Sequence, residues 1–440
     1  MIHLLRKLFS QKTINTFKHL PVAFFANLIN FWPSRKLKII GVTGTDGKTT
    51  TTRIIYSLLK EAGFKTAFVS TISAKIGDEE ISTGLHITSP SSWKLQKLLK
   101  KMVDQKVEYV VLETTSHGLD QNRFWGIHFE VGVITNVTNE HLDYHKSWDN
   151  LLLSKSILLK NSKVVVLNKD DRSFDKLKGI IGSKKIFTYS LKQEADFKAA
   201  GIVTEIDKTK FNLKNKNKLI SLTSPLIGKF NVSNQLAAIA VARFFDVDYK
   251  IIEKAMKQIG SILGRLEFIN NRKRLKIVVD FAHTPNALKN TLGLLREFVK
   301  KGQRLIVVFG AAGLRDFNKR EDMGKIAGKL ADFAVLTSED PRTEDPKTII
   351  NQIGSGCRFS NMKKLGIAKS LLVKKKEIKK GYFSIINRQD AINFAIRNLA
   401  RPHDIVVMCG KGHERSMCFG TTEYPWSEHN AVKIALKEKK

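Results

Sequence analysis

The residues best suited to chemistry lie in a glycine-rich stretch near the start of the chain, GVTGTDGKTTT. It lies between a predicted strand and a predicted helix, where Gly44 and Gly47 would let backbone N–H groups approach a phosphate. Lys48 would supply a cation near the outer phosphates, and Thr49 offers a hydroxyl to Mg²⁺. Only the GxxGKT core of the general phosphate-loop motif is matched, but its place after a strand predicts ATP or GTP binding. Asp46 is unexpected, because a carboxylate repels phosphate unless it points away.

Acidic and imidazole side chains follow other predicted strands, at the edge where open α/β sheets bind ligands. Glu113 closes VEYVVLE, and His141 comes shortly after VGVIT. A carboxylate and an imidazole there could hold Mg²⁺ beside a nucleotide. Either residue alone also fits an ordinary polar position at a strand end. His141 and His145 have the spacing of a zinc pair, but the HExxH frame is absent and zinc is not expected.

The elements that must position these residues alternate along the chain from Lys38 onward. Short β-branched runs predict buried parallel strands: KIIGV, TAFVS, VEYVVLE, VGVIT and KVVVLN, then KIVVD, RLIVVF, DFAVLT and DIVVM. Amphipathic stretches such as 92–105 and 234–245 predict helices between them. The fold class is α/β, a central P-loop ATPase domain with a mostly parallel sheet followed by a Rossmann-like domain. A lysine-rich stretch at 199–222 predicts an antiparallel insertion. The predicted segments are an N-terminal arm over 1–37, the central domain over 38–262 and the C-terminal domain over 263–440.

Composition excludes wholesale disorder and fibrous architectures, since 42% of the 440 residues are hydrophobic and only 9 are Pro. Lys and Arg number 75 against 41 Asp and Glu, a formal charge of +34. This charge predicts attraction to polyanions, unless it only covers solvated faces. The three cysteines, Cys357, Cys409 and Cys418, have no CxxC spacing, which favours a reducing cytoplasm.

The first 37 residues differ from the rest. Apolar residues recur there at helical spacing among basic ones and are followed by aromatic residues: Ile2, Leu4, Leu5, Leu8 and Phe9, with Arg6, Lys7, Lys12 and Lys18, then Phe24, Phe25, Phe31 and Trp32. No apolar run reaches the roughly 18 residues of a spanning helix. The pattern predicts peripheral membrane contact through residues 1–34, at the inner face of the membrane. The alternative is an arm that docks its apolar face on the first domain.

Nine sequence blocks occur in the order found in one enzyme family: GTDGKTTT, ETTSHGLDQNR, NVTNEHLDYH, GKFNVSN, GRLE, DFAHTPNAL, GAAGLRDFNKR, EDPRTEDP and GKGHE. The chain resembles the Mur ligases from about Lys38 to its C-terminus. It is most similar to the UDP-N-acetylmuramoyl-dipeptide ligases, which add the third residue of the peptidoglycan stem. Folylpolyglutamate synthases share the phosphate loop, but the other blocks together point to the peptidoglycan branch.

The resemblance implies ATP-driven amide formation through an acyl phosphate, with ATP and Mg²⁺ as cofactors. Lys48, His141 and Lys155 are the implied catalytic residues. The implied metal site consists of Thr49, Glu113, His141 and Lys155, the last as a carbamate. In the family a lysine is N-carboxylated at this distance after HLDYH, which turns a cation into an anion that can hold Mg²⁺.

The resemblance also implies three groups of binding residues. The ATP group is Gly44, Thr45, Asp46, Gly47, Lys48, Thr49, Thr50, Asn231, Asn234, Arg265, Asp280 and His283. The muramoyl-peptide group is Thr88, Ser89, Ser116, Gln121 and Arg123. The amino-acid group is Asp340, Arg342, Gly410 and Glu414. Arg342 favours meso-diaminopimelate, whose distal carboxylate a guanidinium can bind bidentately, whereas Asp340 could pair with a distal ammonium or hold Arg342.

Departures from the family pattern keep alternatives open. The family has a longer region before the phosphate loop, Glu140 replaces an Asp, and Asp340 replaces an Asn. A related amide ligase acting on a lipid-linked muramoyl peptide or a folate is one alternative to an enzyme acting on UDP-N-acetylmuramoyl-dipeptide and an amino acid. A basic P-loop ATPase that binds nucleic acid is another, although no RNP, KH or helix-turn-helix signature supports a specific nucleic acid.

Overall fold

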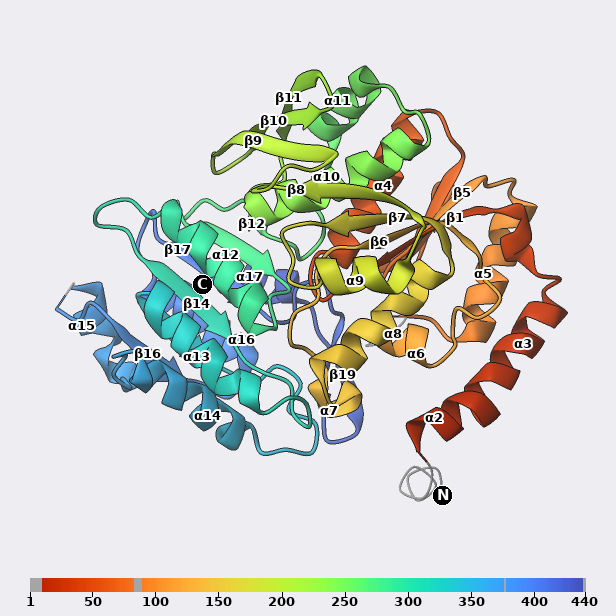
Figure 1. Cartoon of the computed structure of the whole chain (residues 1–440). Coiled ribbons are helices and arrows are strands. Elements are labelled where there is room, and N and C mark those ends of the chain that lie inside the picture. The colour runs from red at the N-terminus through yellow and green to blue at the C-terminus, as the bar shows by residue number, and fades with distance from the viewer. Residues whose placement is uncertain (1–9, 83–88, 376, 438–440) are drawn as a thin grey trace. The chain divides into compact units, whose positions relative to one another are not determined.

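The computed structural model describes residues 10–82, 89–375 and 377–437. The chain divides into two compact units, Met1–Gly260 and Ser261–Lys440, so the division falls next to the predicted boundary after residue 262. Each unit is an α/β structure built on its own sheet, and the predicted fold class is confirmed (Figure 1).

The sheet of the first unit has eleven strands in the order β11-β10-β9-β8-β7-β6-β1-β5-β2-β3-β4. Their bounds are β1 (Lys38–Thr43), β2 (Thr66–Val69), β3 (Ser73–Ile76), β4 (Glu79–Ser82), β5 (Tyr109–Glu113), β6 (Phe129–Ile134), β7 (Ser162–Asn168), β8 (Lys185–Ser190), β9 (Phe197–Thr204), β10 (Thr209–Asn215) and β11 (Lys218–Ser224). Strands β9 to β2 run parallel, and antiparallel strands extend both edges. The predicted lysine-rich insertion is one of these extensions. At the other edge, β2 was predicted, but β3 and β4 were not.

Helices cover both faces of this sheet, so its central strands are buried on both sides. The elements are α2 (Gln11–Ile14), a π-helical turn η1 (Asn15–His19), α3 (Leu20–Ile29), a 3₁₀ turn η2 (Pro33–Lys36), α4 (Lys48–Glu61), α5 (Ser92–Asp104), α6 (Ser116–Asp120), α7 (Leu142–His145), α8 (Trp148–Lys160), α9 (Phe174–Ile181), α10 (Lys229–Phe244) and α11 (Tyr249–Gln258). Helices α5 and α8 enclose one core with Ile39, while α4 packs against α10 and α11. Both Ile39 and its neighbour Ile40 are fully buried, which explains the continuous apolar run of β1.

The sheet of the second unit has the order β12-β13-β17-β14-β15-β16, parallel except for β12. Its strands are β12 (Glu267–Ile269), β13 (Lys276–Asp280), β14 (Leu305–Phe309), β15 (Phe333–Leu336), β16 (Gly381–Ser384) and β17 (Ile405–Cys409), beside a hairpin of β18 (Ser416–Phe419) and β19 (Thr422–Pro425). Its helices are α12 (Pro285–Glu297), α13 (Asn318–Leu330), α14 (Pro346–Phe359), η3 (Ile367–Lys369), α15 (Ser370–Lys374), α16 (Arg388–Asn393), η4 (Phe394–Leu399) and α17 (Glu428–Leu436). One face of the sheet packs on α16, η4 and α17.

The described part of the N-terminal arm, residues 10–37, packs on the first unit, with α3 beside α5 (Figure 1). Its inward residues are small or polar: Ala23, Ala26 and Asn27 are buried. Large apolar residues face outward instead, with Phe17 79% and Phe31 81% exposed. The arm therefore docks, but most of its large apolar side chains in the described part face outward rather than inward as the alternative had proposed. Phe24 is an exception, because its ring lies 5.8 Å from that of Trp125. The apolar and basic positions before Ser10 lie outside the described residues. Among the described helices, none is long and apolar enough to cross a membrane.

Candidate active site

The phosphate loop connects the end of β1 to the start of α4 and presses against two other segments. A Cβ at Gly44 would overlap Oγ1 of Thr135, and one at Gly47 would overlap Oδ1 of Asn234. Gly47 also has φ = 84°, in the left-handed region, directly before the first turn of α4. Only glycine fits both positions, and the loop backbone lies at the N-terminus of α4, where helix N–H groups bind anions.

The backbone of Asp46 is held from the end of β6. Its N–H donates to Oδ1 of Asn136 over 2.9 Å, and its carbonyl accepts from Oγ1 of Thr135 over 2.6 Å and from Nδ2 of Asn136 over 3.1 Å. Nζ of Lys48 donates to the carbonyls of Gly44 (3.1 Å) and Thr45 (2.7 Å). The loop is thus preorganised by contacts that fix its main chain. Asn136 was not singled out from the sequence, although it follows a predicted strand.

Lys155 reaches the same loop from α8. The side chain is buried, and Nζ donates to the carbonyl of Gly44 over 2.6 Å. Burial and the nearby charge of Lys48 lower the pKa of Lys155 to about 7. A lysine that α8 places in the core of the site therefore has a substantial neutral fraction near neutral pH.

Thr49 and Glu113 meet beside the loop. Oγ1 of Thr49 donates to Oε2 of Glu113 over 2.9 Å. Thr71, which was not predicted, donates its N–H to Oε2 (3.0 Å) and its hydroxyl to Oε1 (2.6 Å). A hydroxyl and a carboxylate are ligands that suit Mg²⁺. No group of three or more His, Cys, Asp or Glu residues fit for a metal occurs in the described part of the chain.

The two histidines of α7 and its N-cap have different surroundings. His141 has φ = 54°, its Nε2 lies 3.5 Å from Oε1 of Glu140, and its ring lies 4.7 Å from that of His117. His145 is buried, with Nε2 3.0 Å from Oγ of Ser116 and Nδ1 3.3 Å from Oγ of Ser154. Burial lowers the pKa of His145 to about 4, so the ring is neutral. Both ring nitrogens of His145 therefore lie within hydrogen-bonding distance of serine hydroxyls.

The predicted muramoyl-peptide residues gather around α6. Nε and Nη2 of Arg123 donate to Oε1 of Gln121 over 3.2 and 2.7 Å, and Nη1 donates to the carbonyl of Ser89 over 2.8 Å. Nε2 of Gln121 lies 3.4 Å from the hydroxyl of Tyr144. Ser116 joins them at the start of α6. Thr88 lies outside the described residues.

Two predicted adenine-side residues lie on α10. Nδ2 of Asn231 donates to the carbonyl of Ile227 over 2.8 Å, and Nδ2 of Asn234 donates to Oδ1 of Asn231 over 3.3 Å. Since Asn234 also abuts Gly47, this helix end borders the phosphate loop. Thr50 is buried in the first turn of α4.

In the second unit, three further predicted nucleotide residues surround Phe281. The Arg265 guanidinium lies 4.5 Å from the centre of that ring, and the ring of His283 lies at the same distance. The Asp280 carboxylate accepts hydrogen bonds from the N–H of Leu266 (2.8 Å) and the hydroxyl of Thr291 (2.9 Å). Asp280, at the end of β13, therefore holds the segment before β12 that carries Arg265, and His283 follows Asp280 three residues along the chain.

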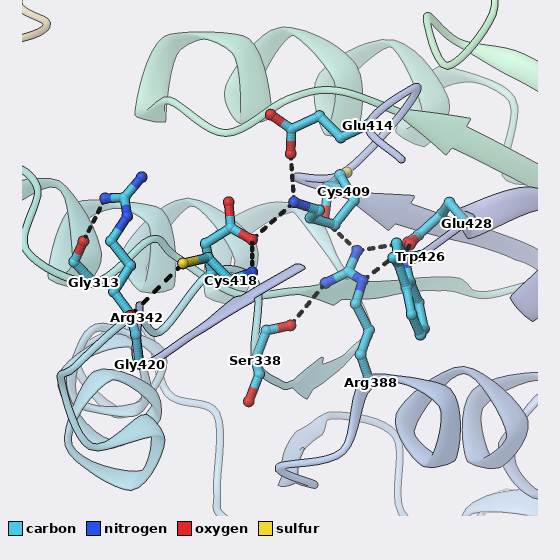
Figure 2. Close-up of polar contacts among 12 residues, drawn as sticks. Gly313, Ser338, Arg342, Arg388, Cys409, Glu414, Cys418, Gly420, Trp426 and Glu428 are labelled. Atoms are coloured by element: carbon cyan, nitrogen blue, oxygen red, sulfur yellow. Dashed lines mark hydrogen bonds and ion pairs between the residues drawn. The ribbon is translucent and has the colours of Figure 1, made fainter. Parts of the chain in front are cut away.

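The predicted amino-acid residues meet around a lysine that was not singled out. Nζ of Lys411 lies 2.9 Å from Oδ1 of Asp340 and 2.5 Å from Oε2 of Glu414. Burial lowers the pKa of Lys411, but the two carboxylates outweigh burial and hold it above the usual value. The backbone of Cys418 links the two parts of the site: its N–H donates to Asp340 (3.0 Å), and its carbonyl accepts from the N–H of Arg342 (3.1 Å). The Arg342 guanidinium donates to the carbonyl of Gly313 over 2.8 Å (Figure 2).

A buried ion pair between Arg388 and Glu428 holds the strand ends next to the predicted amino-acid residues. Arg388 donates to Glu428, with Nη2 to Oε1 at 2.5 Å, and to the carbonyls of Ser338 and Cys409, as Figure 2 shows. Arg388 thereby ties the ends of β15 and β17 together. After β17, Gly410 has φ = 109° and a Cβ there would come within 3.0 Å of Oε2 of Glu339.

Comparisons with known proteins agree with this arrangement. The family model "Mur ligase middle domain" matches residues 42–242, and "Mur ligase, glutamate ligase domain" matches residues 264–412. The chain is 38% identical over 411 residues to a UDP-N-acetylmuramoyl-L-alanyl-D-glutamate–2,6-diaminopimelate ligase of Clostridium botulinum, covering 92% of this chain and 79% of that one. The enzyme of the same name from Bacillus cereus is 35% identical over 431 residues, covering 96% and 82%.

Solved structures show the same fold. A structure of a UDP-N-acetylmuramoyl-L-alanyl-D-glutamate–2,6-diaminopimelate ligase has a TM-score of 0.62 at 30% identity, covering 93% of this chain and 82% of that one. MurF from Acinetobacter baumannii has a TM-score of 0.70 at 17% identity, covering 94% and 81%. The Escherichia coli FolC in complex with ADP has a TM-score of 0.67 at 18% identity, covering 88% and 90%. The chain therefore belongs to the Mur ligase family and is an ATP-dependent ligase.

Proposed function

We propose that this ligase joins the terminal carboxyl of UDP-N-acetylmuramoyl-dipeptide to an amino group of diaminopimelate at the expense of ATP. One observation supports this most: Lys48, Lys155 and the Thr49–Glu113 pair converge on one phosphate loop. The printed names of the relatives support the choice of acceptor and amino acid.

The reaction requires two displacements. The acceptor carboxylate attacks the γ-phosphorus of ATP, and the bond between that phosphorus and the β-phosphate oxygen breaks. The products of this step are an acyl phosphate and ADP. The incoming amine attacks the acyl carbon, loses a proton to solvent and expels inorganic phosphate. Lys48 and the N-terminus of α4 balance charge on the phosphates, while Gln121 and Arg123 orient the acceptor. Mg²⁺, held by Thr49 and Glu113 with His141 and Lys155, would neutralise charge on the transferring group.

We propose that Lys155 carries a carbamate. A second cation beside Lys48 would repel Mg²⁺, whereas a carbamate is an anion that can hold it. Carbamate formation consumes a neutral amine and CO₂ and releases one proton, and the pKa of about 7 leaves that amine available near neutral pH.

Carbon-13 NMR of the protein in ¹³C-bicarbonate tests this proposal. A carbamate signal should appear in wild type and in Lys160→Ala, which changes an exposed lysine of the same helix, but not in Lys155→Ala. Lys155→Ala should be inactive and partly rescued by short carboxylates. Full activity of that variant, or no carbamate signal in wild type, would contradict the proposal.

The charges of the second unit favour diaminopimelate over lysine. Asp340, Glu414 and Lys411 together carry one net negative charge, which suits the distal ammonium. Arg342, linked to Asp340 through Cys418, suits the distal carboxylate. Lysine would leave the Arg342 charge unsatisfied.

Phosphate release with UDP-N-acetylmuramoyl-dipeptide and a panel of amino acids tests the substrate. Diaminopimelate should give the highest kcat/KM. Arg342→Ala should lower the kcat/KM for diaminopimelate about tenfold or more and change the kcat/KM for lysine little. A preference for lysine would overturn the amino-acid assignment. No turnover with any amino acid would favour a different acceptor, such as a lipid-linked muramoyl peptide or a folate.

We also propose that the arm binds an anionic membrane surface peripherally. Its outward face exposes Phe17, Phe25, Leu28, Ile29 and Phe31. No Asp or Glu precedes Asp46 in the chain, whereas Lys12, Lys18, Arg35 and Lys36 are exposed on the arm. Each basic residue near an anionic bilayer contributes about 1 kcal/mol. An apolar face surrounded by positive charge fits an anionic lipid surface.

Co-sedimentation with phosphatidylglycerol vesicles tests this contact. Phe25→Ser/Ile29→Ser and added salt should each reduce binding, whereas Leu219→Ser, an exposed apolar residue of β11, should not. Equal binding of all variants would contradict the proposal, and so would a dimer in place of vesicle binding, which would assign the face to a second copy.

A further inference from the structure

Asn15 is a buried residue in an otherwise exposed part of the arm. It is 8% exposed, whereas Gln11, Thr16 and Phe17 are exposed. The π-helical turn η1 begins at Asn15, and such turns are frequent at functional sites. Nε2 of Gln11 donates to Oδ1 of Asn15 over 2.9 Å and fixes the direction of the amide.

The Asn15 side chain contacts α6, the helix around which the predicted acceptor residues gather. Nδ2 of Asn15 donates to Oδ2 of Asp120 over 2.9 Å, and the main-chain carbonyl of Asn15 accepts from Nδ2 of Asn122 over 3.3 Å. The arm is thereby attached directly before and after Gln121. Two further polar side chains of the arm attach past the end of α6: Asn27 donates to the carbonyl of Trp125 over 3.0 Å, and Ser34 donates to that of Gly126 over 3.3 Å.

Asp120 also contacts Tyr144 of α7. The Tyr144 hydroxyl donates to the same oxygen, Oδ2, over 2.6 Å. Burial and the hydrogen bond to Asp120 raise the pKa of Tyr144 above its usual value, so the phenol stays a donor. That hydroxyl also lies 3.4 Å from Nε2 of Gln121, whose Oε1 holds the Arg123 guanidinium.

The Tyr144 ring links this path to the predicted metal side. It lies 4.3 Å from the ring of His117, which in turn lies 4.7 Å from that of His141. Tyr144 therefore contacts Gln121 and Asp120 through its hydroxyl and His117 through its ring, so a change at the hydroxyl acts first on Gln121.

We propose that Asn15 is a positioning residue for the acceptor. By holding Asp120, it sets Tyr144 and thus the orientation of Gln121 and Arg123, without touching substrate itself. The inference rests on the proposed function, because it takes Gln121 and Arg123 as the residues that bind the muramoyl peptide.

Steady-state kinetics of the full chain test the proposal. Asn15→Leu keeps the side-chain size and removes the side-chain hydrogen bonds to Gln11 and Asp120, so the KM for UDP-N-acetylmuramoyl-dipeptide should rise about five- to tenfold. The KM for ATP and kcat should change less than twofold. Asn27→Leu is the matched control: it weakens the docking of the arm but leaves Asp120 untouched, and its acceptor KM should stay near wild type.

A double-mutant cycle separates positioning from mere docking. Tyr144→Phe keeps the ring and removes the hydroxyl, and it needs no change in the arm. If Asn15 acts through Tyr144, Asn15→Leu/Tyr144→Phe should raise the acceptor KM no further than the larger single effect. Multiplied effects, equal effects on the KM for ATP, or an equal effect of Asn27→Leu would overturn the inference.

Arg123→Ala distinguishes this failure from failure of the proposed function. If Arg123→Ala leaves the acceptor KM unchanged, the assigned acceptor site is wrong. If Arg123→Ala raises the KM and Asn15→Leu does not, only the positioning role is wrong.

Discussion

Replacing Lys411 with Met tests whether buried charges balance one another in the second unit. The Lys411 side chain is fully buried, and those of Asp340 and Glu414 are 6% and 21% exposed. Lys411→Met keeps the apolar stem and leaves both carboxylates without their cation. Breaking such a buried pair costs about 3–5 kcal/mol. The matched control is Lys325→Met: Lys325 lies 2.7 Å from Glu321, but both side chains are partly exposed, and its loss should cost about 0–1 kcal/mol.

Urea denaturation followed by circular dichroism measures the loss, and hydrogen exchange in β17 assigns it to the second unit. Adding Asp340→Asn to Lys411→Met should recover part of the loss, at least about 1 kcal/mol, because it removes one of the two negative charges that Lys411 balances. The single variant should also raise the KM for diaminopimelate. The reasoning is refuted if Lys411→Met and Lys325→Met lower the free energy of unfolding equally.

Three other perturbations have expected outcomes. Gly47→Ala should lower the ATP affinity measured by calorimetry more than tenfold, because the added Cβ overlaps Asn234. The control is Gly63→Ala, at φ = 85° with nothing within 4 Å of its Cβ, which should lower the free energy of unfolding by roughly 1–2 kcal/mol through backbone strain and leave ATP affinity unchanged. Equal ATP affinities of the two variants would contradict this expectation. Arg388→Met should lower the free energy of unfolding by about 3–5 kcal/mol, and a loss below about 1 kcal/mol would exclude a buried ion pair there. The pKa of His145 falls from 6.5 in the unfolded chain to about 4 in the folded one, so on acidification the unfolded chain binds the proton first. The urea concentration at the unfolding midpoint should therefore fall as the pH is lowered from 6.5 towards 4, and it should fall less in His145→Gln. Identical pH profiles of the two proteins would count against a buried neutral ring.

The sequence predicted the features that depend on neighbouring residues along the chain. The phosphate loop is local: its glycines, Lys48 and Thr49 lie between one strand and one helix. The buried strands were predicted because both faces of a parallel strand are covered, which produces continuous apolar runs such as that of β1. Glu113 could be placed at the correct sheet edge, since carboxyl ends of parallel strands meet there. Only the family resemblance implied that Glu113 lies near Thr49, with which it forms a hydrogen bond in the structure.

The arm shows how a local pattern can mislead. Its large apolar residues predicted either a lipid surface or docking through that face. In the structure, Ala23, Ala26 and Asn27 face the protein, because small side chains allow close helix packing and the asparagine amide can satisfy the Trp125 carbonyl. Helical periodicity identifies an apolar face, but it does not decide which face meets the neighbouring helix.

Tertiary structure alone decided which distant residues meet. The sequence by itself identified Lys155 as a polar position in an apolar helix, and only the family resemblance connected it to the loop; in the structure its Nζ contacts Gly44. Lys411, Asn136 and Thr71 were not singled out, although the first two lie within GKGHE and NVTNEHLDYH, because the local sequence does not show what each side chain contacts. Asn136 and Thr71 are half-buried and hold the Asp46 main chain and the Glu113 carboxylate, and Lys411 is buried between two carboxylates. That burial depends on how sheets and helices pack over long sequence separations, whereas the sequence itself determines only the elements and the local loops.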